Sequence, residues 1–121
     1  MSLRKVTPGT KQTKVRNRLN TRKGADVASA ETITLGADGN YFDITGTTGI
    51  SYITTTDWDP GAVVTLQFDG SVTVTHNGGS PAATSAAILL SGAANLSATA
   101  NDTLTLVYDG TTWREIARCV I

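Results

Sequence analysis

The chain has 121 residues, of which 40% are hydrophobic and 17% are charged, and it contains one cysteine and one histidine. This length accommodates one domain with an appendage, and not two domains. No run of apolar residues is long enough to cross a membrane, so we expect no membrane-spanning segment. A secretory signal peptide is not expected either, because no apolar stretch follows the basic N-terminus. A single cysteine excludes a disulfide framework, so stability must come from packing and backbone pairing.

The formal net charge of zero conceals two oppositely charged parts. Eight of the ten Lys and Arg residues lie in the first 23 positions and all ten acids follow them. We therefore expect a basic N-terminal arm over residues 1–25 and a β domain over residues 26–121. The arm has too few apolar side chains to repay the entropy of ordering, so it should be flexible when unbound. Its candidate partner-binding residues are Arg4, Lys5, Lys11, Lys14, Arg16, Arg18, Arg22 and Lys23.

Three interpretations of this arm remain open, namely a solvated tail, a nucleic-acid-binding segment and a segment that docks on an acidic protein surface. Lys and Arg side chains neutralise phosphates. The arm has no aromatic residue to stack on a base, so nucleic-acid binding would be directed at the backbone and would not be sequence-specific. The acidic remainder of the chain would also repel phosphates. We therefore favour docking on a protein, with the arm ordering as it binds.

From Ala25 onward, short runs alternate apolar and polar residues, as in half-buried antiparallel strands. The expected strands are Thr32–Leu35, Asn40–Thr45, Ile50–Ile53, Val64–Asp69, Val72–Thr75, Leu104–Tyr108 and Trp113–Val120. The turn signals between them are Asp38-Gly39, Asp69-Gly70, Asn77-Gly78-Gly79 and Asp109-Gly110, of which the second and fourth are typical of two-residue hairpins. The segment Ala82–Ala87 is the nearest candidate for a helix and is equally compatible with a loop. We predict an all-β fold, an antiparallel β-sandwich or small barrel of about seven to nine strands.

Two further patterns bear on assembly. The segment Val64–Ser71 is similar to Leu104–Thr111, which predicts paired positions in one architecture, although a single recurrence does not make a solenoid. Thr occupies 21 positions, mostly on the outward faces of the expected strands. Lys is absent after Lys23, so these strands have few of the charges that discourage pairing between sheet edges. We therefore expect oligomerisation.

The residues that usually carry chemistry are isolated in this sequence. His76 has no second histidine or nearby cysteine with which to bind zinc, and we expect it at a rim or an interface. Cys119 is expected to be a small apolar residue in the final strand. Asp57 and Asp59 flank Trp58, but their spacing differs from that of a calcium loop, so turn capping is expected. The sequence contains no nucleophile elbow and no phosphate-binding glycine loop. We therefore expect no catalytic activity, no bound cofactor and no metal site.

The stretch Tyr41–Ile53, with the sequence YFDITGTTGISYI, resembles a recurring pattern in structural proteins of tailed bacteriophages. In that pattern an aromatic residue and Ile precede Thr-Gly-Thr-Thr, and an Ile-rich strand follows. The similarity continues in order through Gly61–Gly70, Val74–Gly78, Ile88–Leu90 and Asp102–Trp113. Over roughly Thr32 to Ile116, the chain is similar to β-structured tail-fibre modules and to capsid decoration (cement) proteins.

A short β protein with an N-terminal arm looks more like a decoration protein than a fibre module. This resemblance implies a homotrimer on the outer surface of the virion's capsid. There it would bind the major capsid (coat) protein and stabilise the shell by bridging coat subunits. The arm would dock on coat protein or on an adjacent decoration subunit. The arm residues expected to contribute most are Arg16, Arg18, Arg22 and Lys23.

The alternative implied by the resemblance is a tail-fibre or receptor-binding module that recognises glycans on the host surface. Tyr52, Trp58 or Trp113 would then offer an aromatic face to a sugar ring. Packing in the core is the competing interpretation for each of the three, because aromatic side chains dominate small β cores.

Overall fold

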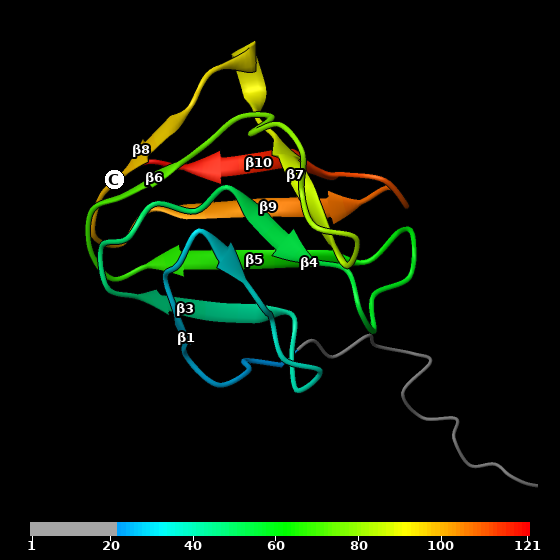
Figure 1. The fold of residues 1–121 in the computed structure, drawn as a ribbon. Helices are drawn as coiled ribbons and strands as arrows, with labels where there is room; N and C mark the ends of the chain where they lie inside the picture. The colour runs from blue at the N-terminus through cyan, green and yellow to red at the C-terminus, as the bar shows by residue number, and fades with distance from the viewer. Residues whose placement is uncertain (1–21) are drawn as a thin grey trace, which may run out of the picture.

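We describe the fold of residues 22–121 from a computed structural model (Figure 1). The expectation of an all-β domain is confirmed for these residues. They form the strands β1 (Val27–Ala28), β2 (Thr32–Ile33), β3 (Tyr41–Thr45), β4 (Tyr52–Thr54), β5 (Val63–Phe68), β6 (Val72–Val74), β7 (Ser85–Leu89), β8 (Leu96–Ala98), β9 (Thr103–Tyr108) and β10 (Trp113–Cys119), with a short 3-10 turn, η4 (Ser91–Ala93), before β8.

Eight of the strands form one sheet in the order β1-β3-β5-β9-β10-β7-β4-β2, and β6 pairs with β8 in a second, two-stranded sheet. The two edge strands of the large sheet, β1 and β2, follow each other in the chain with only residues 29–31 between them. The large sheet therefore curls into a nearly closed, barrel-like shape.

Strand direction differs from the purely antiparallel pairing expected. The pairs β5–β9, β9–β10, β4–β7 and β6–β8 are antiparallel, whereas β1–β3, β3–β5, β2–β4 and β7–β10 are parallel. Period-two alternation shows which side chains share a face, but it is the same for both directions. In β3–β5, strand β4 lies between the two partners in the chain and pairs elsewhere, so the connection is a crossover and not a hairpin.

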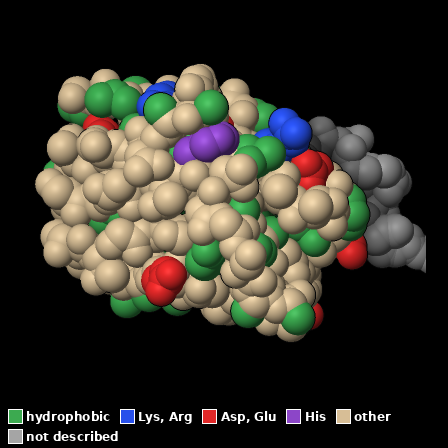
Figure 2. All heavy atoms as spheres, turned by 45° about the horizontal axis from the view of Figure 1, so that its top comes forward, with side chains coloured by type: hydrophobic (Ala, Val, Ile, Leu, Met, Phe, Trp, Pro, Cys, Tyr) green, Lys and Arg blue, Asp and Glu red, His purple; other side chains and the backbone are tan. Residues whose placement is uncertain are grey.

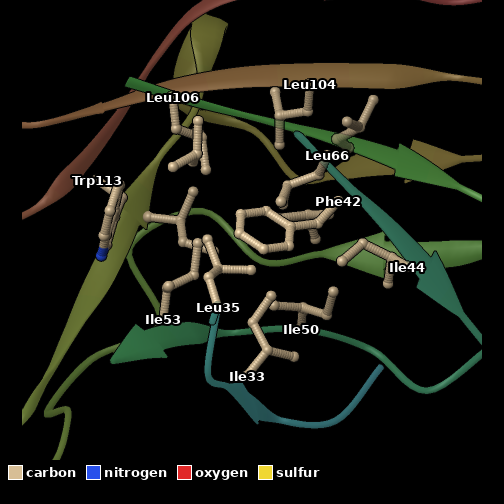
Figure 3. Close-up of a cluster of buried hydrophobic side chains, with 14 of the residues drawn as sticks. Ile33, Leu35, Phe42, Ile44, Ile50, Ile53, Leu66, Leu104, Leu106 and Trp113 are labelled. Atoms are coloured by element: carbon tan, nitrogen blue, oxygen red, sulfur yellow. The ribbon is translucent and has the colours of Figure 1, made fainter. Parts of the chain in front are cut away.

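The inward side chains of the strands meet in one core (Figure 3), with Phe42 near the middle of the labelled group. The expected faces are confirmed, because alternate residues of β3, β5 and β9 are buried. Burying one large aliphatic or aromatic side chain contributes about 1.5–3 kcal/mol, so this core supplies most of the domain's stability. The largest fully buried side chains are Trp113, Phe42, Phe68, Ile33, Ile44, Ile50, Ile53, Leu66, Ile88, Leu104, Leu106 and Val64.

The two similar segments found in the sequence are neighbours in the sheet. Strands β5 and β9 pair antiparallel, with Thr65 opposite Thr105 and Leu66 opposite Leu104. The two copies of the repeated sequence are therefore hydrogen-bonded to each other. The turn at Asp109-Gly110 joins β9 to β10, as expected for a hairpin, but it has four residues between the paired Tyr108 and Trp113. The hairpin expected at Asp69-Gly70 is wrong, because β5 and β6 belong to different sheets.

Two other local expectations change. The segment taken as the nearest helix candidate contributes its second half to strand β7, which antiparallel pairing to β4 holds in place. Strand β10 is not regular, since the register shifts between Glu115 and Ala117 and leaves Ile116 as an inserted residue. Such a bulge changes which residues face the core beyond it.

Candidate functional site

Residues 22–24, which we call the arm root, are paired with strand β3. Lys23 forms a parallel bridge with Tyr41. The amide of Gly24 donates to the Tyr41 carbonyl at 2.8 Å, and the amide of Asn40 donates to the Arg22 carbonyl at 2.8 Å. The described domain thus includes the last residues of the segment that the charge pattern assigned to the arm. Six of the eight candidate partner-binding residues lie outside the described residues, namely Arg4, Lys5, Lys11, Lys14, Arg16 and Arg18.

A close backbone approach holds the arm root against the turn before β3. A Cβ atom on Gly39 would lie 2.4 Å from the Gly24 nitrogen and 2.5 Å from the Arg22 carbonyl oxygen. Real Cβ contacts do not reach such distances, and both atoms belong to the backbone, which cannot rotate away. The glycine read from the sequence as a turn signal is therefore also required by tertiary contact.

The two basic side chains of the arm root, Arg22 and Lys23, differ in their ion pairing. The Lys23 ammonium lies 3.2 Å from Asp43 Oδ2 and 3.5 Å from Asp26 Oδ1. The hydrogen bond to Asp43 is the main cause that raises the pKa of Lys23 above its ordinary value. Lys23 is therefore engaged within the chain, whereas Arg22 makes no ion pair with any of residues 22–121 and lines a hollow beside the root.

This hollow has a volume of about 460 Å3, within the range of ligand sites in proteins. It lies where the arm root, the loop before β3 and the turn after β4 come together. Its chemistry is mixed, because one aromatic ring, carboxylates, an amide and a guanidinium share the lining. The lining residues are Arg22, Leu35, Ala37, Asp38, Gly39, Asn40, Asp57 and Trp58.

Trp58 is fixed in the hollow by the turns on either side of it. Its amide donates to the Thr55 carbonyl at 3.1 Å, and the amide of Ala62 donates to the Asp59 carbonyl at 3.1 Å. Asp57 has a φ of 70° in the first of these turns, a left-handed conformation that Asp tolerates better than most residues. Backbone hydrogen bonds therefore close both turns, in place of the carboxylate capping expected from the sequence.

Of the three aromatic residues considered as sugar platforms, only Trp58 lines the hollow. Trp113 is fully buried, so for this residue core packing is confirmed. Tyr52 is half-buried, and its hydroxyl donates to the Gly78 carbonyl at 2.7 Å. The Trp58 ring is half-buried and meets the Trp113 ring edge-on, with centroids 5.8 Å apart and planes at 82°. The buried tryptophan thereby supports the one at the surface.

His76 and Cys119 do not come together in a reactive site. His76 is half-buried and joins three elements, because its Nδ1 accepts from the Leu90 amide at 2.9 Å while its own amide donates to Asn95 Oδ1 at 2.8 Å. Cys119 lies in the last strand, as expected, but is exposed. Within residues 22–121 no group of three or more His, Cys, Asp or Glu side chains is placed to hold a metal ion.

Three acidic side chains act as structural acceptors. The amides of Thr99 and Ile121 donate to the buried Asp102 carboxylate and lower its pKa. Backbone amides of the Asp109 turn lower the pKa of Asp109, and the Arg118 guanidinium lowers that of Glu115. These shifts run opposite to those that prepare a carboxyl group to act as a general acid near neutral pH.

Within residues 22–121, no helix is long enough and apolar enough to span a bilayer. Comparison with protein-family models, with curated proteins and with solved structures finds no match to this chain. Its candidate function therefore rests on its own residues.

Proposed function

We propose that the chain is a non-enzymatic structural protein of a tailed-phage virion. It binds the exterior of the capsid through its basic arm, as a homotrimer, and stabilises the shell by bridging coat subunits. The proposal combines the resemblance of Thr32–Ile116 to decoration proteins with the separation of charge along the chain.

The observation that carries the docking role is the anchored arm root. A bridging arm is useful only if force on it reaches the folded domain. Two backbone hydrogen bonds at 2.8 Å join the root to Tyr41 of β3 and to the residue before it, and the ion pair of Lys23 with Asp43 adds a second contact to the strand. Strand β3 lies between β1 and β5 in the large sheet, so a pull on the arm acts on paired strands and not on a free loop. A net hydrogen bond contributes about 1 kcal/mol, which makes the contacts modest singly and useful together.

The positive charge of the arm determines which kind of surface it binds. The segment before Arg22 contains six basic residues and no acid, so it is attracted to acidic protein surfaces. Attraction between exposed charges is screened within about 8 Å at physiological salt, and attachment through the arm should therefore weaken as salt rises. Three copies in a trimer would add avidity to weak individual contacts.

The surface of the domain is compatible with assembly. Charged side chains are few and scattered on the face shown in Figure 2. Three of the four exposed large hydrophobic side chains of the described residues, those of Ile116, Val120 and Ile121, lie near the end of β10. Sedimentation velocity tests the trimer directly, and a species with the mass of one chain at tens of micromolar would remove the trimer from the proposal.

Cosedimentation with undecorated mature capsids of the source phage tests the function. We expect saturable binding at a fixed ratio to coat protein. The informative variant replaces the six basic residues before Arg22 by Gln and leaves the arm root intact. It should bind much more weakly, with the loss concentrated at low salt. The proposal fails if the folded full-length protein does not pellet with shells, and the arm's role fails if the variant pellets equally well.

A further inference from the structure

We propose that the hollow beside Trp58 binds a neutral sugar residue. This function differs from docking by the arm in its ligand, a small neutral molecule and not an acidic protein surface, although Arg22 of the arm root is among the lining residues. Its volume of about 460 Å3 falls within the range of small-molecule sites in proteins.

The lining selects a ligand that both donates and accepts hydrogen bonds. The Arg22 guanidinium only donates, the carboxylates of Asp38 and Asp57 only accept, and the Asn40 amide does both. An anionic ligand would be repelled by the two carboxylates, and a cationic one would be repelled by Arg22. A neutral molecule with several hydroxyl groups has partners for all four side chains. The apolar face of a sugar ring also fits against an indole ring such as that of Trp58.

Several of these groups are held in place before a ligand arrives. The Asp38 Oδ2 atom accepts from the Ala25 amide at 2.9 Å, and the Asn40 Nδ2 atom donates to the Val63 carbonyl at 3.0 Å. The second polar atom of each side chain, Oδ1 in both Asp38 and Asn40, forms no hydrogen bond to residues 22–121. These two atoms are therefore left to bind a ligand. The turns around Trp58 and its edge contact with Trp113 fix the ring. Groups ordered in advance lose less entropy on binding.

The test uses the full-length protein and measures saturation-transfer difference NMR together with tryptophan fluorescence. The probes are the methyl glycosides of glucose, galactose, mannose and N-acetylglucosamine. We expect at least one to bind saturably with a millimolar dissociation constant, as suits a single ring on an open site. Glucosamine and methyl glucuronide carry opposite charges and should each bind more weakly than the best neutral probe. Tighter binding of either charged probe would overturn the assignment to a neutral sugar.

Three variants in the hollow and one control outside it locate the binding. Trp58→Ala should weaken it at least tenfold and Trp58→Phe should weaken it less, because an aromatic face remains. Asp57→Asn should weaken it severalfold while keeping a residue that tolerates a positive φ. Tyr52→Phe, outside the hollow, should leave it unchanged. If Trp58→Ala does not fold, the other two variants decide the matter.

Two results would overturn the site, namely no saturable binding by any neutral probe and binding that the Trp58 and Asp57 variants leave unchanged. The variant that lacks the six arm charges should bind sugar normally. Failure of the sugar site is thereby distinguished from failure of capsid attachment. Oligomers of the best probe show whether the ligand is a free sugar or part of a longer glycan, because only a longer glycan should bind more tightly than its single residue.

Discussion

The hydroxyl oxygens of Thr65 and Thr105 lie 2.9 Å apart, on the two strands that carry the repeated sequence. These residues are register partners at the centre of the β5–β9 pair. One hydroxyl must donate and the other accept, so the two threonines form a unit that neither could form alone. The face outside the barrel is therefore ordered by a side-chain hydrogen bond as well as by the backbone ladder.

A double-mutant cycle should show this coupling. Thr65→Val or Thr105→Val alone leaves one half-buried hydroxyl without its partner and should lower the free energy of unfolding by about 1 kcal/mol. The double variant should lose less free energy of unfolding than the two single variants lose together, because two valines pack well across a pair of strands. Urea denaturation measures all four proteins, and Thr73→Val on an exposed position serves as control. Strict additivity would show that the hydroxyls do not interact.

The faces of the strands could be predicted from the sequence because burial follows alternation directly. Val64, Leu66 and Phe68 are buried as expected, and so are Leu104 and Leu106. The repeat also predicted paired positions, and β5 and β9 are paired. These features depend only on which side chains are apolar and on their order, which the sequence contains.

Strand direction and sheet membership could not be predicted in the same way. The residues around Asp69-Gly70 show alternation followed by a turn signal, as a hairpin does, yet β6 pairs with β8. The partner of β6 lies more than twenty residues further along the chain, and local propensity contains no information about it. Strand β7 was missed because Ala86 and Ala87 have low β propensity, which burial and pairing to β4 override.

The bulge at Ile116 places two charged residues on the same face of β10. Glu115 lies opposite Leu106 and Arg118 lies opposite Leu104, both of which face the core. Residues three apart in a regular strand would lie on opposite faces. The Glu115 side chain is only 5% exposed, and its carboxylate accepts from Arg118 Nε at 2.6 Å and from the Ser91 amide at 2.8 Å. The ion pair thus covers one end of the core.

Replacing Glu115 by Gln should reveal what this ion pair contributes. The variant keeps the volume of the buried Glu115 side chain but leaves the partly exposed Arg118 guanidinium without a charged acceptor. The free energy of unfolding should fall by about 2 kcal/mol. Chemical denaturation measures the loss, and Glu31→Gln at an exposed position provides the matched control. A cost equal to that of the control would mean that the pair does not contribute to stability.

Asp109 should make stability depend on pH in the acid range. Donation from the amides of Thr112 and Thr111, together with Arg114, lowers the pKa of Asp109 in the folded state. An unfolded Asp titrates near 3.8. The contribution of the ionised carboxylate is therefore complete above about pH 5 and is lost as the pH falls through the unfolded value toward the folded one.

The test compares Asp109→Asn with the parent protein in thermal unfolding between neutral pH and pH 2. The parent should be the more stable at neutral pH, and the difference should shrink steadily below about pH 4, because the unfolded parent then takes up a proton at Asp109 while the folded parent still holds an ionised carboxylate. Asp59→Asn, at an exposed position, removes the same charge and serves as the control. If the difference in unfolding temperature between parent and variant stayed constant over the whole pH range, the charge of Asp109 would not contribute to stability, and the prediction would be wrong.

The candidate sugar site could be predicted only in part. Asp57 and Asp59 were interpreted as turn residues, and Trp58 was considered as a sugar platform with core packing as the competing interpretation. The other contributors are distant in the sequence and were interpreted otherwise, Arg22 as an arm residue, Asp38 as a turn residue and Asn40 as the start of a strand. They join Trp58 because Gly39 lets the arm root approach the loop before β3. That contact depends on the absence of a side chain, which a single sequence does not distinguish from the needs of a turn.

Gly39→Ala should loosen the arm root without removing any charge from the arm. The added methyl group would meet the Gly24 nitrogen and the Arg22 carbonyl oxygen, so residues 22–24 must move away from β3. Hydrogen exchange at the Gly24 and Tyr41 amides should become at least tenfold faster, and global stability should fall by about 1–2 kcal/mol. Gly70→Ala, whose Cβ meets nothing nearer than 3.4 Å, is the control and should leave both amides protected.

The same variant separates attachment to a capsid from reinforcement of it. Because its arm keeps every basic residue, Gly39→Ala should still cosediment with shells, with nearly the affinity of the parent. The protection that it gives shells against heat should be smaller, since force on the arm no longer reaches β3 through the root contacts at 2.8 Å. Thermal release of packaged DNA measures this protection, with Gly70→Ala compared at equal occupancy. Full protection by a variant whose root amides exchange rapidly would show that the arm stabilises shells without its anchor on the sheet, and the bridging role would then belong to another surface of the domain.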